Sequence, residues 1–192
     1  MRFLPAMLNV CGKRCLVVGA GTVALRRARA LITAGAVVTV VAPELDPTFE
    51  ALPVTVQRRP YRRADLDGTW LVVVASSEAA VNRSVAADGR AAGVLVNRPD
   101  DPGAGDFTVP AHAHHGPVTL AVHTGGVSAA ASAAIRRQLS GALDPDWPRL
   151  LEVVKPFRRQ IQDRCDDPRV RRALLKQLTS PESMAILKQQ GN

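Results

Sequence analysis

Three small residues are spaced in a way that suits phosphate binding. Gly19, Gly21 and Ala24 form the pattern Gly-x-Gly-x-x-Ala between an apolar segment and a segment of helical composition. In a strand–turn–helix unit the first glycine permits a tight turn, the second lets the backbone approach a pyrophosphate, and the small third residue lets helix and strand pack closely. Free N–H groups and the helix dipole attract the phosphates. We therefore predict a dinucleotide site, with an ordinary glycine turn as the alternative.

An acidic residue, Glu44, follows the second apolar segment, which ends Val41-Ala42-Pro43. In dinucleotide-binding folds an acid near the end of the second strand hydrogen-bonds the adenosine ribose. Glu44 comes slightly later than that position, so it is either a ribose ligand or a surface residue that opens the next turn. No arginine directly follows the strand to accept a 2′-phosphate, and the pattern therefore favours NAD over NADP.

Two adjacent carboxylates, Asp100 and Asp101, come after another apolar segment, which ends at Asn97. Parallel α/β folds place their chemistry at the carboxyl ends of strands, and a carboxylate beside a bound nicotinamide can act as a general base. Adjacent loop residues point in different directions, so we expect only one of the pair to face a ligand. Composition alone favours the alternative, a turn rich in Asp and Pro.

A second glycine-rich turn, Thr124-Gly125-Gly126-Val127-Ser128, precedes an alanine-rich segment. Ser128 is a suitable N-cap residue. The free N–H groups of such a turn suit a substrate carboxylate, and a capped helix without any ligand explains the pattern equally well. His123 stands immediately before this turn and is the histidine of most interest in the chain.

The remaining histidines and cysteines do not form a convincing metal site. The histidine cluster invites a metal interpretation, but the Gly-Pro pair that follows it favours a solvated hairpin turn; its members are His112, His114 and His115. The odd number and spacing of the cysteines fit neither a zinc site nor a disulfide framework; they are Cys11, Cys15 and Cys165. We expect Cys15 to be a small buried apolar residue.

The segments that must position these residues alternate between strand and helix over the first hundred residues. Strands separated by helices imply a parallel, doubly wound sheet with ligands at the carboxyl ends of its strands. We expect helices at Thr22–Thr33 and Glu78–Ala92, the second capped by Ser76 or Ser77. The expected strands are Arg14–Val18, Val37–Val41, Val54–Val56, Trp70–Ala75 and Val94–Asn97.

The pattern changes at Arg98–Gly105, a loop rich in Pro, Asp and Gly. Beyond it we expect strands at Phe107–Val109 and Val118–His123 and a helix over about Ser128 to Leu139. The tail from Pro145 predicts short helices that are interrupted at its prolines: Pro156, Pro168 and Pro181. The expected organisation is an NAD-binding Rossmann domain (1–105), a small α+β dimerisation region (106–143) and a helical tail (144–192).

Composition narrows the class of protein. Hydrophobic residues make up 46% of the 192 residues and charged residues 22%, which is typical of a globular chain. No apolar run approaches the roughly 20 residues that span a bilayer, and no signal-peptide core is present, so we expect a cytoplasmic protein without membrane contact. The net charge of +8 favours polyanionic partners, although a solvated basic surface is the alternative. Aromatic residues are only 4%, and no nucleic-acid motif is present, so we expect no nucleic-acid partner.

Taken together, these motifs resemble the precorrin-2 dehydrogenase family, the N-terminal module of siroheme synthases. The resemblance runs from about Leu4 to Leu143 in unbroken order. It is most specific in Asn97-x-x-Asp100-x-Pro102, which is followed by Phe107 and Pro110. The other segments that carry it are Val17 to Ala24, Arg27-Ala28-Arg29, Val40 to Pro43, Trp70 to Asn82, Thr124 to Ser128 and Ile135-Arg136-Arg137.

The resemblance implies an enzyme that oxidises precorrin-2 to sirohydrochlorin with NAD, and in some members then inserts ferrous iron as a substrate. It implies a homodimer and places the essential aspartate at Asp100. The implied cofactor contacts are Gly19, Ala20, Gly21, Thr22, Val23, Ala24, Ala42, Pro43, Glu44, Ala75, Ser76 and Asn97. The implied substrate contacts are His123, Gly125, Gly126 and Ser128, with basic residues expected at Arg136, Arg137, Arg158 and Arg159 for the many substrate carboxylates.

Two residues depart from the pattern of that family. His123 stands where a serine is common, and Ala129 replaces the proline that usually follows Ser128. Both changes lie among the expected substrate contacts. They leave open whether this chain also inserts iron. The competing hypothesis is a non-catalytic NAD-binding Rossmann protein that senses redox state, in which Asp100 is only a turn residue. A nucleic-acid binder that uses the basic tail is a third class.

Overall fold

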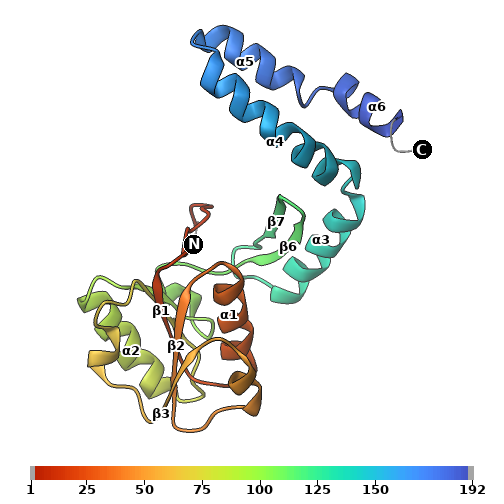
Figure 1. Cartoon of the computed structure of the whole chain (residues 1–192). Helices are drawn as coiled ribbons and strands as arrows, with labels where there is room; N and C mark the ends of the chain where they lie inside the picture. Colours follow the sequence, from red (N-terminus) through yellow and green to blue (C-terminus); the bar gives the residue numbers. More distant parts are fainter. Residues whose placement is uncertain (1–2, 190–192) are drawn as a thin grey trace. The chain divides into compact units, whose positions relative to one another are not determined.

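The computed structural model describes residues 3–189, which fall into two compact units with the boundary between Val109 and Pro110. The first unit contains a parallel sheet, and the second contains a two-stranded sheet and four helices (Figure 1). None of the helices in the described part of the chain is long and apolar enough to span a membrane.

The first unit is built on five parallel strands in the order β3-β2-β1-β4-β5. This arrangement confirms the predicted α/β fold with a doubly wound parallel sheet. The chain moves outward from β1 to β3 on one side, then returns to add β4 and β5 on the other. The strands are β1 (Arg14–Val18), β2 (Val37–Ala42), β3 (Thr55–Arg58), β4 (Leu71–Val74) and β5 (Leu95–Asn97).

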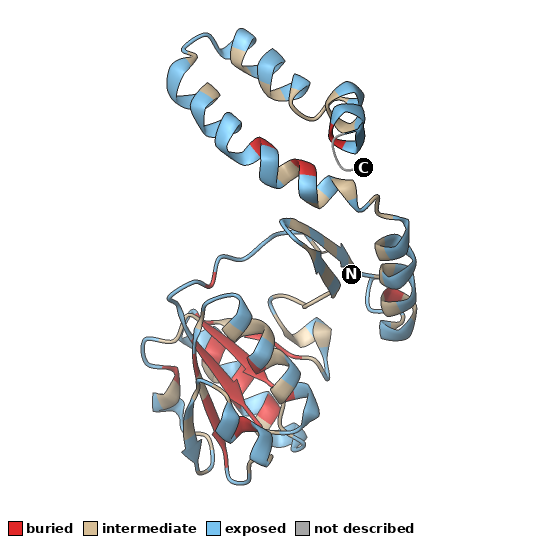
Figure 2. Ribbon diagram, turned by 45° about the vertical axis from the view of Figure 1, so that its right-hand side comes forward, coloured by how far each residue is buried: buried red, intermediate tan, exposed pale blue. Residues whose placement is uncertain are grey.

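Helices α1 (Thr22–Thr33) and α2 (Ala79–Ala91) cover opposite faces of this sheet (Figure 1). On α1, Ala24 and Ala28 pack into one buried cluster with alternate residues of β1 and β2. On α2, Val85 and Ala86 pack into a second cluster against the other face. Because both faces are covered, the central strands consist of almost uninterrupted apolar residues, and they are buried along most of their length (Figure 2).

Short 3₁₀ helices stand in three of the connections of the first unit. They are η1 (Pro47–Ala51) between β2 and β3, η2 (Arg63–Leu66) between β3 and β4, and η3 (Pro102–Ala104) after β5. The side chain of Asp46 caps η1 by accepting a hydrogen bond from the Thr48 N–H at 2.8 Å.

Two local predictions for the first unit are wrong. The N-cap of α2 is Glu78, not Ser76 or Ser77. The Ser76 hydroxyl accepts from the Glu78 N–H at 3.0 Å in the turn that precedes the helix. Residues 107–109 form no strand either: Phe107 makes only an isolated parallel bridge with Asn97. Its ring packs against the first core cluster instead of continuing a ladder.

The second unit begins with an antiparallel pair, β6 (Ala111–His115) and β7 (Val118–Val122). The histidine cluster therefore lies on a strand and not in the predicted turn. Alternation along β6 explains why it is tolerated: Ala111, Ala113 and His115 share the partly buried face with the apolar residues of β7, while His112 and His114 are exposed. Helix α3 (Ala129–Ala142) packs on this pair, and Ser128 is its N-cap, as predicted.

The tail forms α4 (Asp146–Arg164), α5 (Pro168–Gln177) and α6 (Pro181–Gln189). The prolines that begin α5 and α6 confirm the predicted breaks, since proline is favoured at the first helical position. Pro156, in contrast, lies inside α4 and does not end it. Buried contacts of Leu150 and Val154 with Leu187 hold α4 together on the N-terminal side of this proline, so tertiary packing outweighs the single lost hydrogen bond.

Candidate functional site

The carboxyl ends of the parallel strands bring the predicted turns to one edge of the sheet. Strand order reverses between β1 and β4, and ligands of open α/β sheets bind outside the strand ends at such a switch point. Backbone hydrogen bonds hold the turns there: the Gly19 N–H donates to the Val41 carbonyl at 2.9 Å, and the Ala75 N–H donates to the Val18 carbonyl at 2.8 Å.

Gly19 is required by the packing of the turns after β1 and β4. Its φ of +105° is in the region that favours glycine, and a Cβ there would lie 2.3 Å from the Ala75 carbonyl oxygen and 2.7 Å from the Ser76 nitrogen. No side chain fits between these two backbones. The first glycine of the pattern is therefore fixed by the fold of the protein itself.

Gly21 is different, because nothing in the described chain requires glycine there. It is the N-cap of α1 with an ordinary φ of −81°, and a Cβ would meet no atom within 4 Å. No side chain caps the helix, and its first turn contains no acidic residue. A helix start with uncapped N–H groups and open space in front is suited to a phosphate.

The other residues of this motif divide between packing and exposure. Ala24 is fully buried in the first core cluster, so it serves helix–strand packing. Thr22 and Val23 are exposed at the helix start, and Ala20 is half-buried. The exposed pair is therefore available to a ligand at the edge of the sheet, whereas Ala24 contributes through the close approach of α1 to the strands.

Beyond β2, Glu44 is exposed and makes no hydrogen bond or ion pair with the residues the structure describes. Ala42 is buried at the strand end, and Pro43 is exposed. The nearby acid Asp46 is already committed to capping η1. Glu44 is thus the carboxylate at this strand end that remains available to a ligand.

A hydrogen-bond network joins the ends of β4 and β5. The carboxylate of Asp100 accepts from Arg98 twice, from Nε to Oδ1 at 3.2 Å and from Nη2 to Oδ2 at 2.6 Å. It also accepts from Asn82 Nδ2 at 3.2 Å. Asn82, buried on α2, in turn binds the backbone N–H and carbonyl of Ser76. The turns that carry Ser76 and Asp100 are held together through one side chain.

This network separates the two adjacent aspartates. Hydrogen bonds from Arg98, and then from Asn82, hold the pKa of Asp100 below its usual range, so this carboxyl is ionised at neutral pH. Asp101 approaches Arg98 only at 3.8 Å, and its side chain is more exposed, 55% against 40% for Asp100. Asp100 is the one held in a defined orientation.

Asn97 is buried at the end of β5, with 2% of its surface exposed. Its Nδ2 donates to the Phe107 carbonyl at 2.9 Å and so ties down the chain that returns past β5. Its Oδ1 is buried without a hydrogen-bond partner among the described residues. Buried acceptors are almost always satisfied, so this oxygen is suited to a donor on a bound molecule.

The predicted substrate contacts belong to the second unit. Gly125 and Gly126 have positive φ values and open space around them. The Ser128 hydroxyl accepts from the Ala131 N–H at 3.0 Å as the cap of α3. His123 is exposed, and its Nδ1 accepts from the Gly125 N–H at 3.2 Å. These residues form one structured turn within that unit.

The three remaining histidines do not converge. The rings of His112 and His114 lie edge to face with centroids 5.6 Å apart on the exposed face of β6, whereas His115 is on the other face. Within residues 3–189, no group of three or more His, Cys, Asp or Glu side chains is placed to hold a metal ion. Cys15 is buried in the first strand, and burial raises its pKa to about 11.

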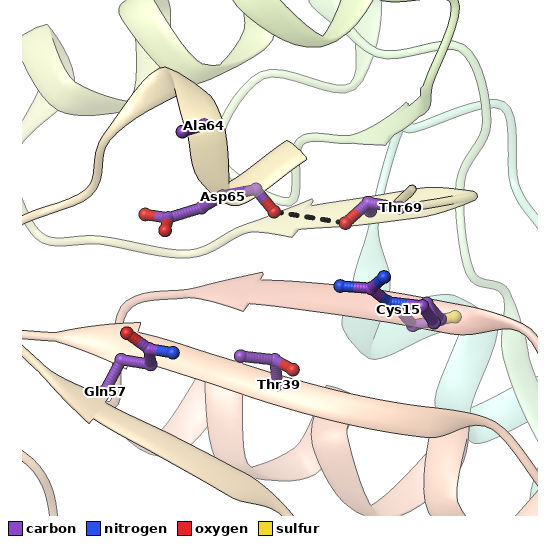
Figure 3. A pocket seen from close by; sticks show the side chains of 7 residues that line it. Cys15, Thr39, Gln57, Ala64, Asp65 and Thr69 are labelled. Atoms are coloured by element: carbon purple, nitrogen blue, oxygen red, sulfur yellow. Dashed lines mark hydrogen bonds between the residues drawn. The ribbon is translucent and has the colours of Figure 1, made fainter. Parts of the chain in front are cut away.

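A polar pocket of about 170 Å³ lies on the sheet face that η2 covers (Figure 3). Its residues come from the strands and from η2: Arg14, Cys15, Thr39, Gln57, Ala64, Asp65 and Thr69. The Asp65 carboxylate accepts from Arg59 and from the Arg62 N–H, and the Thr69 hydroxyl donates to the Asp65 carbonyl. The polar groups of Asp65 and Thr69 therefore serve the fold, and the pocket includes none of the predicted site residues.

Sequence reasoning did not assign roles to Arg98 and Asn82. Asn82 occupies the same helix face as Val85, Ala86 and Gly89, all buried. A polar residue on a buried helix face needs hydrogen-bond partners, and that was the available signal. For Arg98 there was no such signal, because its burial depends on contacts outside its own segment.

Comparison with known proteins finds similar sequences over most of the chain. A family model described as "Putative NAD(P)-binding" matches residues 6–111. A siroheme synthase from Chromobacterium violaceum is 40% identical over 176 residues, and one from Pseudomonas fluorescens strain SBW25 is 34% identical over 182. These matches cover 90% and 93% of this chain but only 37% and 39% of the relatives, so the chain spans about two-fifths of their length.

Among solved structures, one named "SirC, precorrin-2 dehydrogenase" matches with a TM-score of 0.76 and 27% identity, covering 98% of each chain. The similarity therefore includes both compact units and not only the parallel sheet.

The two glycines of the motif should respond differently to the same substitution. Gly19→Ala should destabilise the fold by about 2–5 kcal/mol, because it combines a strained positive φ with a backbone clash. Gly21→Ala should cost about 1 kcal/mol or less, since it meets open space and only weakens the cap. Urea-induced unfolding of both variants measures the difference; equal stability losses would contradict the proposed packing at Gly19.

Proposed function

The chain belongs to the NAD(P)-binding family whose model covers its first unit, and from this we propose that it is a precorrin-2 dehydrogenase that uses NAD. The reaction removes a hydride and a proton from precorrin-2 and yields sirohydrochlorin, NADH and H⁺. The observation that carries the proposal is the oriented carboxylate of Asp100 at the same sheet edge as an unobstructed helix N-terminus. The names of the related siroheme synthases and of the similar dehydrogenase structure support it.

The residues present fit a bound dinucleotide. The open space at Gly21 and the uncapped start of α1 suit the pyrophosphate, with N–H groups supplied at Thr22 and Val23. The available Glu44 suits the ribose hydroxyls and would repel a 2′-phosphate, which supports NAD in preference to NADP. The unpartnered Oδ1 of Asn97 offers an acceptor at the end of β5. When bound, NAD supplies the hydride acceptor.

Asp100 is proposed as the group that takes the proton lost from the macrocycle. It is ionised at neutral pH and 40% exposed, so it can reach a ligand while its hydrogen bonds keep its direction. The Asp101 side chain lacks that support. An oriented carboxylate beside the reacting ring satisfies the geometric requirement for general-base catalysis.

The basic second unit supports a substrate with many carboxylates. Arg137, Arg158 and Arg159 are exposed on α3 and α4, and the Nε of Arg136 is buried without a partner in the described chain. We propose that such residues, with the Gly125–Gly126 turn and Ser128, meet the substrate carboxylates. Ferrous iron, if inserted, would be a second substrate of the same chain.

An effect on cofactor binding can be separated from an effect on fold stability by two measurements on one variant. Gly21→Asp should weaken NAD binding on the order of 100-fold or more, because a like charge placed against the pyrophosphate costs several kcal/mol. The same change should leave stability equal or higher, since aspartate is a favourable N-cap. Isothermal titration calorimetry and urea unfolding measure the two effects. Normal NAD affinity in this variant would show that the nucleotide site is elsewhere.

Loss of the Asp100 carboxylate should reduce catalysis and leave cofactor binding unchanged. Asp100→Ala and the similarly shaped Asp100→Asn should lower dehydrogenase turnover roughly 10²–10⁴-fold, while Asp101→Ala should have a small effect. The assay follows absorbance after mixing the protein with precorrin-2 and NAD, with and without ferrous iron. Full turnover in both Asp100 variants would refute the base assignment. NAD binding without turnover in the unmodified protein would favour a redox sensor.

We also propose that two copies of the chain associate through the second unit. Val127, Ile135 and Leu139 are large apolar residues left 87%, 41% and 47% exposed near and along α3. Within residues 3–189, each strand of the two-stranded β6–β7 sheet has one edge that no other strand pairs with, and such sheets are marginally stable alone. A second copy would cover both features.

Light scattering at micromolar concentration should therefore give twice the 20.5 kDa chain mass. Ile135→Glu should shift the population towards monomer by placing a charge in the apolar contact. Leu174→Glu is a matched control, because Leu174 is 44% exposed on α5. A monomeric unmodified protein, or dissociation by the control alone, would contradict this interface.

A further inference from the structure

We propose that Arg98 is a positioning residue that holds the Asp100 carboxylate in one direction at the carboxyl edge of the sheet. This inference rests on the proposed function, because it concerns the carboxylate that takes the proton in that reaction. Arg98 itself would not touch the substrate: it is 6% exposed at the end of β5 and acts through Asp100.

The contact has the geometry of a strong ion pair. Nε and Nη2 of Arg98 each donate to a different oxygen of Asp100, at 3.2 and 2.6 Å. A two-pronged contact of this kind sets the plane of the carboxylate as well as its distance. Asn82 Nδ2 donates to Oδ2 from α2, so donors from two different elements hold the same group.

Burial makes the arginine the fixed member of the pair. Its side chain is 7% exposed, against 40% for Asp100. A buried guanidinium cannot deprotonate and needs a compensating carboxylate. Among the described residues only Asp100 and Asp101 form ion pairs with it, and Asp101 is at 3.8 Å. If Asp100 turned towards solvent, the buried guanidinium would keep only the longer contact with Asp101, so the packing around Arg98 dictates where Asp100 points.

The electrostatic consequence follows from the same contacts. The Arg98 hydrogen bond is the main cause of the lowered pKa of Asp100, and Asn82 adds to it. The charged groups that act on the site come from the segment after β5: Arg98 directly, and Asp101 through its pairing with Arg98. The neighbour from α2 is the neutral Asn82. Asp100 therefore keeps its charge as pH falls and loses it only below the usual range of an aspartate.

Asp100, which accepts the proton in the proposed reaction, is therefore already charged before the substrate binds. As the hydride leaves, positive charge develops on the macrocycle, and a fixed anion stabilises it without having to reorganise. The acid limb of the pH–rate profile should then be set by a carboxylate of lowered pKa, so activity should persist to more acidic pH than an ordinary aspartate would allow.

The test measures the titration of Asp100 directly. The carboxyl carbons of the full chain, labelled with ¹³C at aspartate, are followed by NMR as pH falls, and Asp100→Asn identifies the signal. We expect a midpoint below the usual aspartate range in the unmodified protein. In Arg98→Gln, which keeps a hydrogen-bond donor and removes the charge, the midpoint should rise, and in Arg98→Lys it should return towards the original value.

Kinetics on the same variants test the positioning role. Arg98→Gln should move the acid limb of kcat upward in pH together with the Asp100 midpoint. It should also lower kcat at neutral pH on the order of 10- to 100-fold, as expected for losing hydrogen bonds to a charged group, with NAD affinity unchanged. Arg98→Lys should recover the acid limb but not the full kcat, because one ammonium group cannot reproduce the paired contact of Nε and Nη2 with the two carboxylate oxygens. Arg83→Gln is the matched control and should change neither, because Arg83 is exposed on α2 and makes no hydrogen bond or ion pair with the residues the structure describes.

The outcomes separate this inference from the proposed function. An ordinary Asp100 midpoint in the unmodified protein would overturn it even if every Arg98 variant failed to fold. So would a low midpoint that persists in Arg98→Gln, since some other group would then hold the charge. A midpoint that behaves as expected in a chain without dehydrogenase activity would support the hold of Arg98 on Asp100 and refute only the proposed reaction.

Discussion

At Gly19 the turn after β1 comes so close to the turn after β4 that one added carbon would lie 2.3 Å from the Ala75 carbonyl oxygen. The arrangement of the carboxyl edge depends on this approach. It brings the start of α1 beside the turn that carries Ser76, at the point where strand order reverses. From Ser76 the contacts continue through Asn82 to Asp100, so a backbone constraint at one turn is passed on to a carboxylate two strands away.

The site combines groups that are committed with groups that are available. Arg98, Asn82 and the nitrogen of Asn97 are buried and hydrogen-bonded within the protein. The start of α1, the Glu44 carboxylate and the Oδ1 of Asn97 have no such partners in the described chain. A preorganised site requires this division. The groups that are hydrogen-bonded within the protein fix the geometry, and the others can form hydrogen bonds with a ligand.

The second unit differs from the first in how little of it is buried. Its helices are exposed over most of their surface (Figure 2), and its buried clusters are small. It carries much of the excess positive charge, and several of its large apolar residues are left exposed by the described part of the chain. A unit with these properties is better suited to binding a partner surface or a charged substrate than to being stable alone.

The sequence alone determined the five parallel strands and the two α-helices of the first unit, because their signals are local: β-branched apolar segments bounded by glycine turns predict buried parallel strands. In the second unit, Ser128 was identifiable as a cap from its own neighbourhood. The sequence also identified Gly19 and Gly21 without distinguishing a glycine required by packing from one with open space before it. Only the tertiary structure decided that difference, together with the strand that contains the histidines, the continuity of α4 through Pro156 and the burial of Arg98. Each of these depends on contacts between segments far apart in the chain, and a local pattern cannot encode which distant side chain will cover a residue. The same reason explains Asp100 and Asp101: adjacent and chemically identical in the sequence, they differ because a buried arginine and a residue from α2 hold only one of them in place.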